Sequence, residues 1–333
     1  RLLRACCRYA CDRSVALVLI LAVAILAPLL LDWKTAQRLP SVEAKVTRLD
    51  AQVVEHTRGA LQASPTAATG AAPDRLRLRL PTTTPVARGR ARHSSFYSAA
   101  LGRAMDYWLY LPPGYASTAR RYPVLYVLHG RGGGSGEWKD YGLFDEADRL
   151  IREKRIAPLM IVSPQGDLGY WMNHAGGGER WGDYITGDLI PHIDATYRTE
   201  AEPRHRAIGG ISMGGHGALQ LALNNPGLFG AVGGHSAVFR AEAEAFPFFG
   251  SGVDYQRRDP VSLVQDLSTP VTFALWLDIG ADDPWLPRTL YFHELLAQRG
   301  IAHVWHLDPG GHERGYWQRH LRAYLEWYDK GLR

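Results

Sequence analysis

A serine between glycines is the first candidate for chemistry in this chain. Ser212 lies in GGISMGGHGAL (209–219), where the residues from Gly210 to Gly214 read G-x-S-x-G. An apolar segment precedes the serine and a helix-forming segment follows it, which is the strand–turn–helix setting of a nucleophile elbow. Glycines beside the serine remove side chains that would collide in such a turn. We therefore predict that Ser212 is a nucleophile.

A serine hydroxyl reacts poorly unless a base takes its proton, so a histidine is expected late in the chain. His312 lies in HLDPGGHERGYW (306–317), after a predicted strand and before the last predicted helix. His303 and His306 are rivals, but they fall inside that strand. The position on a glycine-rich loop favours His312 as the base.

The acid that orients such a histidine is expected between the serine and the histidine. The segment LDIGADDPWL (277–286) holds Asp278, Asp282 and Asp283. Asp278 is predicted to end a strand, so Asp282 or Asp283 is better placed on the loop. The resulting order of serine, aspartate and histidine is that of the α/β-hydrolases.

A glycine-rich loop supplies candidate hydrogen-bond donors for an oxyanion. LHGRGGG (128–134) follows a predicted strand, and its backbone N–H groups could act with the N–H of Met213, just after the nucleophile. Glycine-rich loops also bind phosphates, but no G-K-[ST] follows, which argues against a P-loop. His129 is expected to shape this loop rather than act as a base.

The elements that must position these loops alternate along residues 93–333. Predicted strands cover residues 106–111, 124–128, 159–163, 207–211, 231–234, 272–278 and 302–307. Predicted helices cover residues 183–197, 214–224, 286–299 and 315–328. This alternation predicts an α/β fold with a mostly parallel central sheet and helices on both faces. Sites in such sheets form at the carboxyl ends of the strands.

The first 92 residues have a different character. Residues 15–31 read VALVLILAVAILAPLLL, seventeen residues without a charge, which is near the lower limit for crossing a bilayer. We predict a basic segment at 1–13, a transmembrane anchor at 14–33, a stalk helix with a Pro/Ala/Thr-rich linker at 34–92, and the catalytic domain at 93–333.

A cleaved signal peptide is the alternative to this anchor. The sequence AVA at 22–24 resembles a cleavage site, but cleavage there would leave an apolar end. Basic residues flank the run on both sides and are denser before it, which favours a cytoplasmic N-terminus and an exported domain on the periplasmic or extracellular side. Cys6, Cys7 and Cys11 all precede the run, so the later domain has no disulfide, thiol nucleophile or cysteine metal site.

The net charge of +5 is unevenly distributed. Residues 1–92 hold 15 Lys and Arg against 6 Asp and Glu, and the remainder holds 23 against 27. The expected domain is therefore slightly acidic, which argues against a nucleic-acid-binding surface.

Together these motifs resemble the esterase D and feruloyl-esterase branch of the α/β-hydrolases, which also includes the mycolyltransferases. The resemblance covers roughly residues 93–333 and rests on YLPPGY (110–115), YPVLYVLHGRGG (122–133), GDLIPHIDATYRT (187–199), GGISMGGHGAL (209–219), GADDPWL (280–286) and GGHERGYW (310–317). It implies the α/β-hydrolase fold and no metal or organic cofactor.

The resemblance also assigns roles to residues. It implies Ser212 as nucleophile, His312 as base and Asp283 as acid, with Asp282 as the rival. It implies oxyanion donors from the backbones of two residues, Arg131 and Met213. The S-formylglutathione hydrolases of this branch are soluble and cytosolic, so the expected anchor counts against glutathione thioester chemistry.

Aromatic loops are the candidates for substrate binding. The Gly- and Trp-rich stretch 167–184 supplies Trp171, Asn173, Trp181 and Asp183, and Trp138 and Trp285 lie near the oxyanion and acid loops. Residues 237–262 contain Phe246, Phe248 and Phe249, a candidate apolar cap. Trp317 is expected to pack the last helix.

The sequence therefore predicts a membrane-tethered serine esterase that works through an acyl-enzyme. An acyltransferase that moves the acyl group to a carbohydrate or lipid alcohol would use the same residues, so the sequence does not separate the two. A non-enzymatic binding protein on a hydrolase scaffold is disfavoured because all three triad positions are filled.

Overall fold

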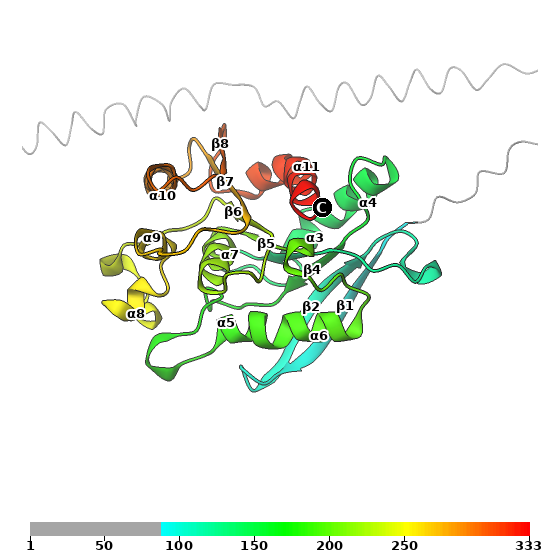
Figure 1. The fold of residues 1–333 in the computed structure, drawn as a ribbon, viewed down its shortest axis with the longest axis horizontal. Coiled ribbons are helices and arrows are strands. Elements are labelled where there is room, and N and C mark those ends of the chain that lie inside the picture. Colours follow the sequence, from blue (N-terminus) through cyan, green and yellow to red (C-terminus); the bar gives the residue numbers. More distant parts are fainter. Residues whose placement is uncertain (1–87) are drawn as a thin grey trace, which may run out of the picture. The chain divides into compact units, whose positions relative to one another are not determined.

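An eight-stranded sheet forms the centre of the computed structural model, which describes residues 88–333 (Figure 1). Its strands are ordered β1-β2-β4-β3-β5-β6-β7-β8. β1 and β2 are antiparallel to each other, β2 is antiparallel to β4, and all later neighbours are parallel. The strands are β1 (Arg90–Ser98), β2 (Arg103–Leu111), β3 (Val124–Leu128), β4 (Met160–Pro164), β5 (Arg206–Ile211), β6 (Ala231–His235), β7 (Ala274–Gly280) and β8 (Val304–Asp308).

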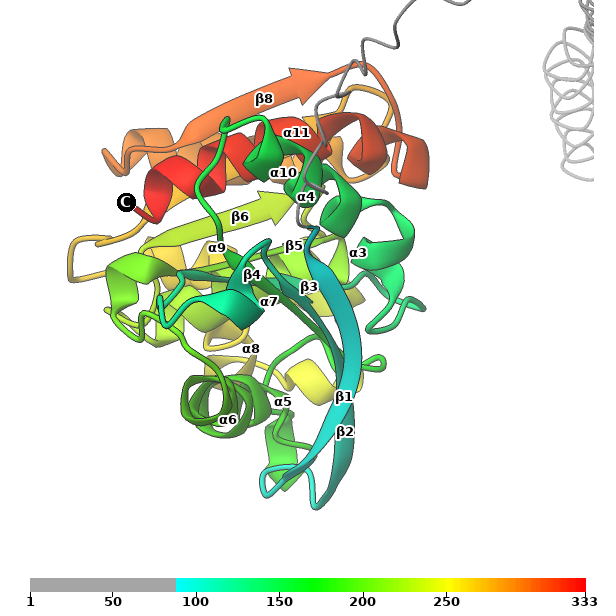
Figure 2. The ribbon, with the colours of Figure 1, turned by 90° about the vertical axis from the view of Figure 1, so that its right-hand side faces the viewer.

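Helices cover both faces of this sheet, and the sheet twists so that β1 and β8 run in clearly different directions (Figure 2). One face carries α3 (Glu137–Asp140), α4 (Leu143–Arg152) and α11 (Arg314–Gly331). The other carries α5 (Trp181–Asp183), the π-helical turn η3 (Tyr184–Leu189), α6 (Ile190–Thr196), α7 (Met213–Asn224), α9 (Pro260–Gln265) and α10 (Leu286–Gln298), with α8 (Val253–Gln256) beside them. The predicted mostly parallel α/β architecture is confirmed.

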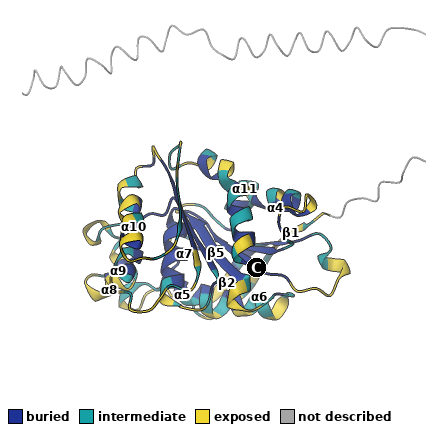
Figure 3. Ribbon diagram, turned by 45° about the horizontal axis from the view of Figure 1, so that its top comes forward, coloured by how far each residue is buried: buried dark blue, intermediate teal, exposed yellow. Residues whose placement is uncertain are grey.

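Strand β3 shows why the chain builds two cores. Val124, Tyr126 and Leu128 pack into the core beneath α7, whereas Leu125 and Val127 pack into the core beneath α4 and α11. Alternate side chains of a strand point to opposite faces, so an all-apolar strand needs cover on both sides. The burial map follows the same rule, with buried strands inside and exposed outer helix faces (Figure 3).

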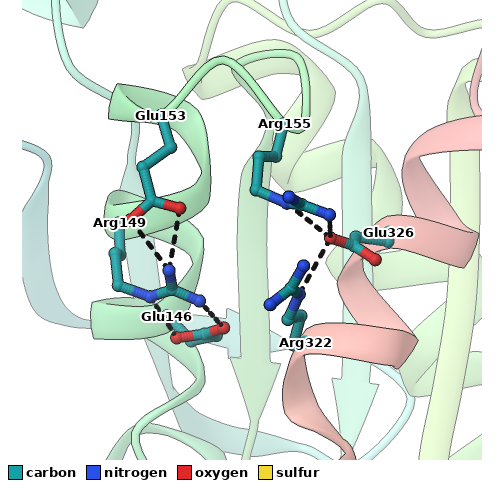
Figure 4. A network of polar contacts seen from close by, with 6 residues as sticks. All are labelled: Glu146, Arg149, Glu153, Arg155, Arg322 and Glu326. Carbon is teal, nitrogen blue, oxygen red and sulfur yellow. Dashed lines mark hydrogen bonds and ion pairs between the residues drawn. The ribbon is translucent and has the colours of Figure 1, made fainter.

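Ion pairs join the outer helices of the α11 face. Arg155, in the loop after α4, and Arg322 of α11 both contact the carboxylate of Glu326, at 2.8 and 3.1 Å (Figure 4). Arg149 of α4 pairs with Glu146 of the same helix and with Glu153, the residue that follows it. Exposed pairs of this kind contribute up to about 1 kcal/mol each, so they align the helices rather than hold the fold.

The seven predicted strands and four predicted helices all occur, with shifted ends. The prediction missed β1, the helices α3 and α4 between β3 and β4, and the helices α8 and α9 between β6 and β7. β1 begins at Arg90, slightly ahead of the predicted domain boundary at residue 93. The predicted basic segment (1–13), anchor (14–33) and most of the stalk and linker (34–92) lie outside the described residues. No helix of residues 88–333 is long and apolar enough to span a bilayer.

Candidate active site

Ser212 occupies a strained turn between β5 and α7. Its backbone has φ 56° and ψ −117°, in a region that residues other than glycine rarely adopt. A Cβ at Gly214 would overlap the Leu128 carbonyl, and one at Gly210 would overlap the backbone of Gly214. These two glycines therefore allow the turn, which presents the serine at the carboxyl end of β5 as in a nucleophile elbow.

Three side chains from separate loops form one hydrogen-bonded chain. Nε2 of His312 lies 2.8 Å from Oγ of Ser212, and Nδ1 of the same ring lies 2.7 Å from Oδ2 of Asp283. These distances match those between a nucleophile, its base and the group that orients the base. The structure thus brings together the predicted residues of all three loops.

The two adjacent aspartates of the acid loop have different surroundings. The side chain of Asp283 is buried, and its second oxygen accepts the Trp285 N–H at 2.9 Å. Asp282 is exposed, and it contributes its backbone N–H to the Gly310 carbonyl. The carboxylate that contacts His312 is therefore that of Asp283, and the geometry removes the ambiguity that spacing left.

An indole supports the His312 ring. Trp317 of α11 meets that ring edge-on, with centroids 5.2 Å apart, and donates its indole N–H to Ser236. The rival histidines lie elsewhere: His303 contacts His293, and His306 stacks on the Trp276 ring. Trp317 thus packs the last helix as predicted and also positions the histidine.

The loop after β3 passes beside the serine. A Cβ built on Gly130 would lie 3.5 Å from the Ser212 Cβ, so the following residue, Arg131, begins next to the nucleophile. Glu137 fixes this loop by accepting the Gly130 N–H at 2.7 Å. The N–H of Met213 is the first of helix α7 and has no intrahelical acceptor. The two residues predicted to supply the oxyanion N–H groups therefore belong to segments that adjoin the nucleophile.

His129 shapes this loop as a neutral ring. Its Nε2 accepts the Gly166 N–H at 2.9 Å, and its Nδ1 lies 2.8 Å from the Gly130 carbonyl, so the proton belongs on Nδ1. Burial holds the pKa of His129 below its ordinary value. The histidine therefore joins the loop to the end of β4, in the structural role expected for it.

A second histidine–aspartate pair lies buried behind the elbow, and the sequence analysis did not find it. Nδ1 of His235 lies 2.6 Å from Asp278, and the His235 carbonyl accepts the Ser212 N–H. Burial alone would raise the pKa of Asp278, but His235 and hydrogen bonds from Tyr324 and Trp276 hold it below its ordinary value. Asp278 lies inside β7 rather than at its end, which directs its carboxylate into the core.

The prediction that three tryptophans bind the substrate is wrong. Trp138, Trp171 and Trp181 are at most 1% exposed, which leaves no surface for a ligand. Trp138 donates to the Leu128 carbonyl and Trp171 to the His129 carbonyl, so both indoles support the oxyanion loop from within. These tryptophans pack the core and do not bind a ligand, because each large ring fills the space beneath a tight turn.

Of the other residues predicted to bind the substrate, some have a structural role and some are partly exposed. The side-chain oxygen of Asn173 accepts the Asp183 backbone N–H at 3.0 Å, and the Asp183 carboxylate pairs with Arg180, so both polar side chains stabilise the segment around α5. Phe249 is fully buried, whereas Phe246 and Phe248 are partly exposed. Trp285 is partly exposed two residues after the acid, so of the predicted substrate-binding tryptophans it alone has surface that a substrate could contact.

Comparison with known proteins agrees with this geometry. The chain matches the family described as putative esterase over residues 98–328. It belongs to this family. The resemblance to esterases that the sequence predicts is thereby confirmed, and residues 88–333 form an esterase-family domain.

Curated relatives include several esterases. An esterase of Mycobacterium tuberculosis is 30% identical over 253 residues, 65% of this chain and 54% of the relative. An endo-1,4-beta-xylanase/feruloyl esterase of Xylanibacter ruminicola is 31% identical over 153 residues, 44% of this chain and 21% of the relative. The chain thus spans about half the length of the mycobacterial relative that it matches.

Solved structures share the fold. A ferulic acid esterase has a TM-score of 0.66 at 24% identity, with 74% of this chain and 99% of that chain covered. An S-formylglutathione hydrolase from Agrobacterium tumefaciens has a TM-score of 0.64 at 22% identity, with 74% and 96% covered. At these identities the likeness establishes the α/β-hydrolase fold of the described domain.

Proposed function

We propose that this protein is a serine esterase in which Ser212 is the nucleophile, His312 the general base and Asp283 the orienting acid. The observation that carries the proposal is the unbroken chain of hydrogen bonds from Asp283 through His312 to Ser212, with the serine in a strained elbow. Membership of the putative esterase family supports the same chemistry.

The reaction follows from this arrangement. Oγ of Ser212 attacks the ester carbonyl while Nε2 of His312 takes its proton, and Asp283 stabilises the imidazolium through Nδ1. The negative charge on the former carbonyl oxygen is held by the backbone N–H groups of Arg131 and Met213. The imidazolium then protonates the leaving alcohol. Water, deprotonated by the same histidine, releases the acid from the acyl-enzyme.

The test is hydrolysis of short- and medium-chain 4-nitrophenyl esters by the full chain. Ser212→Ala should remove activity and labelling by a fluorophosphonate probe, because the covalent step is lost. Ser268→Ala is the matched control, since that serine is exposed and outside the site. A Ser212→Ala protein that hydrolyses esters as the wild type does would overturn the proposal.

Relatives narrow the esters to try first. The names feruloyl esterase and acetyl esterase describe relatives of this chain, so we propose carboxylic esters with aromatic or short acyl groups as substrates. The alternative is acyl transfer to a carbohydrate or lipid alcohol, which uses the same triad. Product analysis with an added alcohol acceptor distinguishes them: free acid alone indicates hydrolysis, and a new ester indicates transfer.

The proposal also includes tethering. The uncharged run at 15–31 and the polar linker that follows it are sequence features of a domain held at a membrane surface. The denser basic flank before the run supports export of the catalytic domain to the periplasmic or extracellular side.

A further inference from the structure

Two arginines and two aromatic rings form one wall beside Ser212, which we call the cationic wall: Arg131, Arg240, Phe246 and Trp285. The Arg131 guanidinium lies 5.2 Å from the centroid of the Phe246 ring. The Arg240 guanidinium lies 4.7 Å from the same centroid and 4.8 Å from that of Trp285. Both guanidinium groups thus contact the same phenyl ring.

Three of the four residues of this wall are connected to the triad through short stretches of chain. Arg131 follows Gly130, which lies against Ser212. Arg240 comes two residues after Val238, whose N–H donates to the Ser212 carbonyl at 3.2 Å. The N–H of Trp285 donates to the acid itself. The wall therefore borders the place where an ester bound to Ser212 would lie.

The two charges of the wall have no carboxylate partner within residues 88–333, although several other arginines there form ion pairs. Arg288, also near the wall, pairs with Glu244 at 3.1 Å, but neither Arg131 nor Arg240 forms an ion pair. Glu137, the acid nearest along the chain to Arg131, accepts hydrogen bonds from Gly130 and Tyr141 instead. Two cations held together without a counter-ion produce a local positive potential that attracts an anion.

The geometry of Arg240 suits such a role. Its Nε donates to the Tyr170 hydroxyl at 3.1 Å, which fixes the plane of the guanidinium while the two terminal nitrogens have no acceptor among the described residues. Arg240 is half-buried, so a charge that it pairs with is partly removed from water. A guanidinium oriented in this way matches the two oxygens of a carboxylate.

We propose that the cationic wall is a subsite for a carboxylate carried by the ester substrate, so that the enzyme prefers acidic esters to neutral ones. The inference rests on the proposed esterase function and adds a substrate class to it. Arg131 and Arg240 are specificity residues in this role, separate from the backbone N–H of Arg131 that binds the oxyanion.

The experiment compares matched charged and neutral esters on the full chain. For an acid on the acyl side, the pair is mono-4-nitrophenyl adipate and 4-nitrophenyl hexanoate. For an acid on the alcohol side, the pair is the butanoyl ester of 4-hydroxybenzoate and that of 4-hydroxybenzamide. In one pair, kcat/KM for the charged ester should exceed that for the neutral ester about tenfold or more, and the ratio should fall as salt is raised.

Substitutions test whether the cationic wall causes the higher kcat/KM for the charged ester. Arg240→Gln and Arg131→Gln should each reduce the ratio several-fold, and Arg131→Glu should bring it below one. Arg120→Gln is the matched control, since Arg120 is exposed and stacks on the Tyr122 ring away from the triad. It should leave the ratio unchanged.

The failures of the two proposals are distinguishable. A wild-type ratio near or below one in both pairs, or a ratio that the arginine variants do not alter, would overturn the subsite while Ser212-dependent hydrolysis of the neutral esters stood. Absence of all Ser212-dependent hydrolysis and labelling would overturn the esterase function itself. Labelling by a neutral fluorophosphonate shows that each variant keeps its reactive serine.

Discussion

At the scale of single residues, burial separates groups that the sequence presents as equivalent. Asp282 and Asp283 are neighbours in one loop, but a single step along the chain turns one carboxylate to solvent and the other to His312. Asp278, a third candidate, is buried against His235 in the core. Spacing along the chain gives the loop; the direction of each side chain depends on tertiary packing, which spacing does not encode.

Removing the charge of Asp283 should therefore be far more damaging than removing that of Asp282. In Asp283→Asn the amide stabilises the imidazolium poorly and favours the wrong tautomer, so kcat should fall about 10³- to 10⁴-fold. Asp282→Asn, the matched control, should change kcat by less than about twofold. Steady-state kinetics on one 4-nitrophenyl ester measures both. Equal losses in the two variants would contradict the assignment.

His129 gives the fold a dependence on pH. Its pKa is lowered from 6.5 in the folded protein, so the unfolded chain binds the proton more readily. The stability that neutral His129 contributes is complete above pH 6.5 and is lost as the pH falls below that value towards the folded pKa. Protonation would also break the hydrogen bond from the Gly166 N–H.

Glutamine does not titrate, so only the wild type should lose the stability contributed by neutral His129 at acidic pH. We therefore expect the difference in unfolding free energy between the wild type and His129→Gln to become smaller as the pH falls. The gap should change by up to about 1.4 kcal/mol per pH unit below pH 6.5. Urea unfolding of both proteins at pH 7.5 and 5.5 measures it, and the side-by-side comparison cancels the other histidines. A gap that stays constant between these pH values would contradict the assignment.

At the scale of elements, the sequence predicts best those strands and helices whose pattern of apolar residues has a single physical cause. The five-residue run of β3 is apolar at every position because both faces are covered. β1, missed by the prediction, is an edge strand whose residues are mostly exposed, so it lacks the alternation that would reveal it. Helix α4 has only 10 residues and follows a glycine loop, so its amphipathic pattern extends over fewer than three turns.

The turn at Ser212 is an element whose glycines can be tested individually. Gly214→Ala would place a Cβ into the Leu128 carbonyl, so unfolding free energy should fall by about 3 kcal/mol or more and activity should be lost. At Gly187, in the helical segment η3, a Cβ meets nothing within 4 Å. Gly187→Ala should leave activity intact and keep or raise stability by up to about 1 kcal/mol.

Thermal unfolding and ester hydrolysis of both variants check this prediction. If Gly214→Ala retained wild-type stability and activity, the tight approach between α7 and β3 would not be what requires glycine. Stability lost equally at Gly187 would point instead to a general intolerance of alanine in these segments.

At the scale of the whole molecule, the family match marks out one part of the sequence. The family match begins at residue 98, so residues 1–97 lie before it. Charge follows the same division, since the excess of basic residues is confined to 1–92. The fold of the esterase domain could be predicted because its motifs recur at fixed places in the sheet. The N-terminal part offers hydropathy and composition alone.

The hydropathy of residues 15–31 makes a quantitative prediction about membrane association of the protein. If residues 15–31 span a bilayer, the full chain expressed in bacteria should sediment with membranes and resist extraction at high pH, and its mass should show no cleavage near residue 24. Arginine at the centre of a span costs about 2.5–3.5 kcal/mol, and the leucine or isoleucine that it replaces contributes about 0.3–0.6 kcal/mol. The double variant Leu19→Arg, Ile25→Arg should therefore lose about 6–8 kcal/mol of insertion free energy and leave the membrane fraction. Protease should be added to cells whose outer envelope is permeabilised and whose cytoplasmic membrane is intact. It should digest the wild-type catalytic domain only if that domain is exported. A wild-type chain found in the soluble fraction at full mass would contradict the anchor, and one shortened near residue 24 would establish the signal peptide instead.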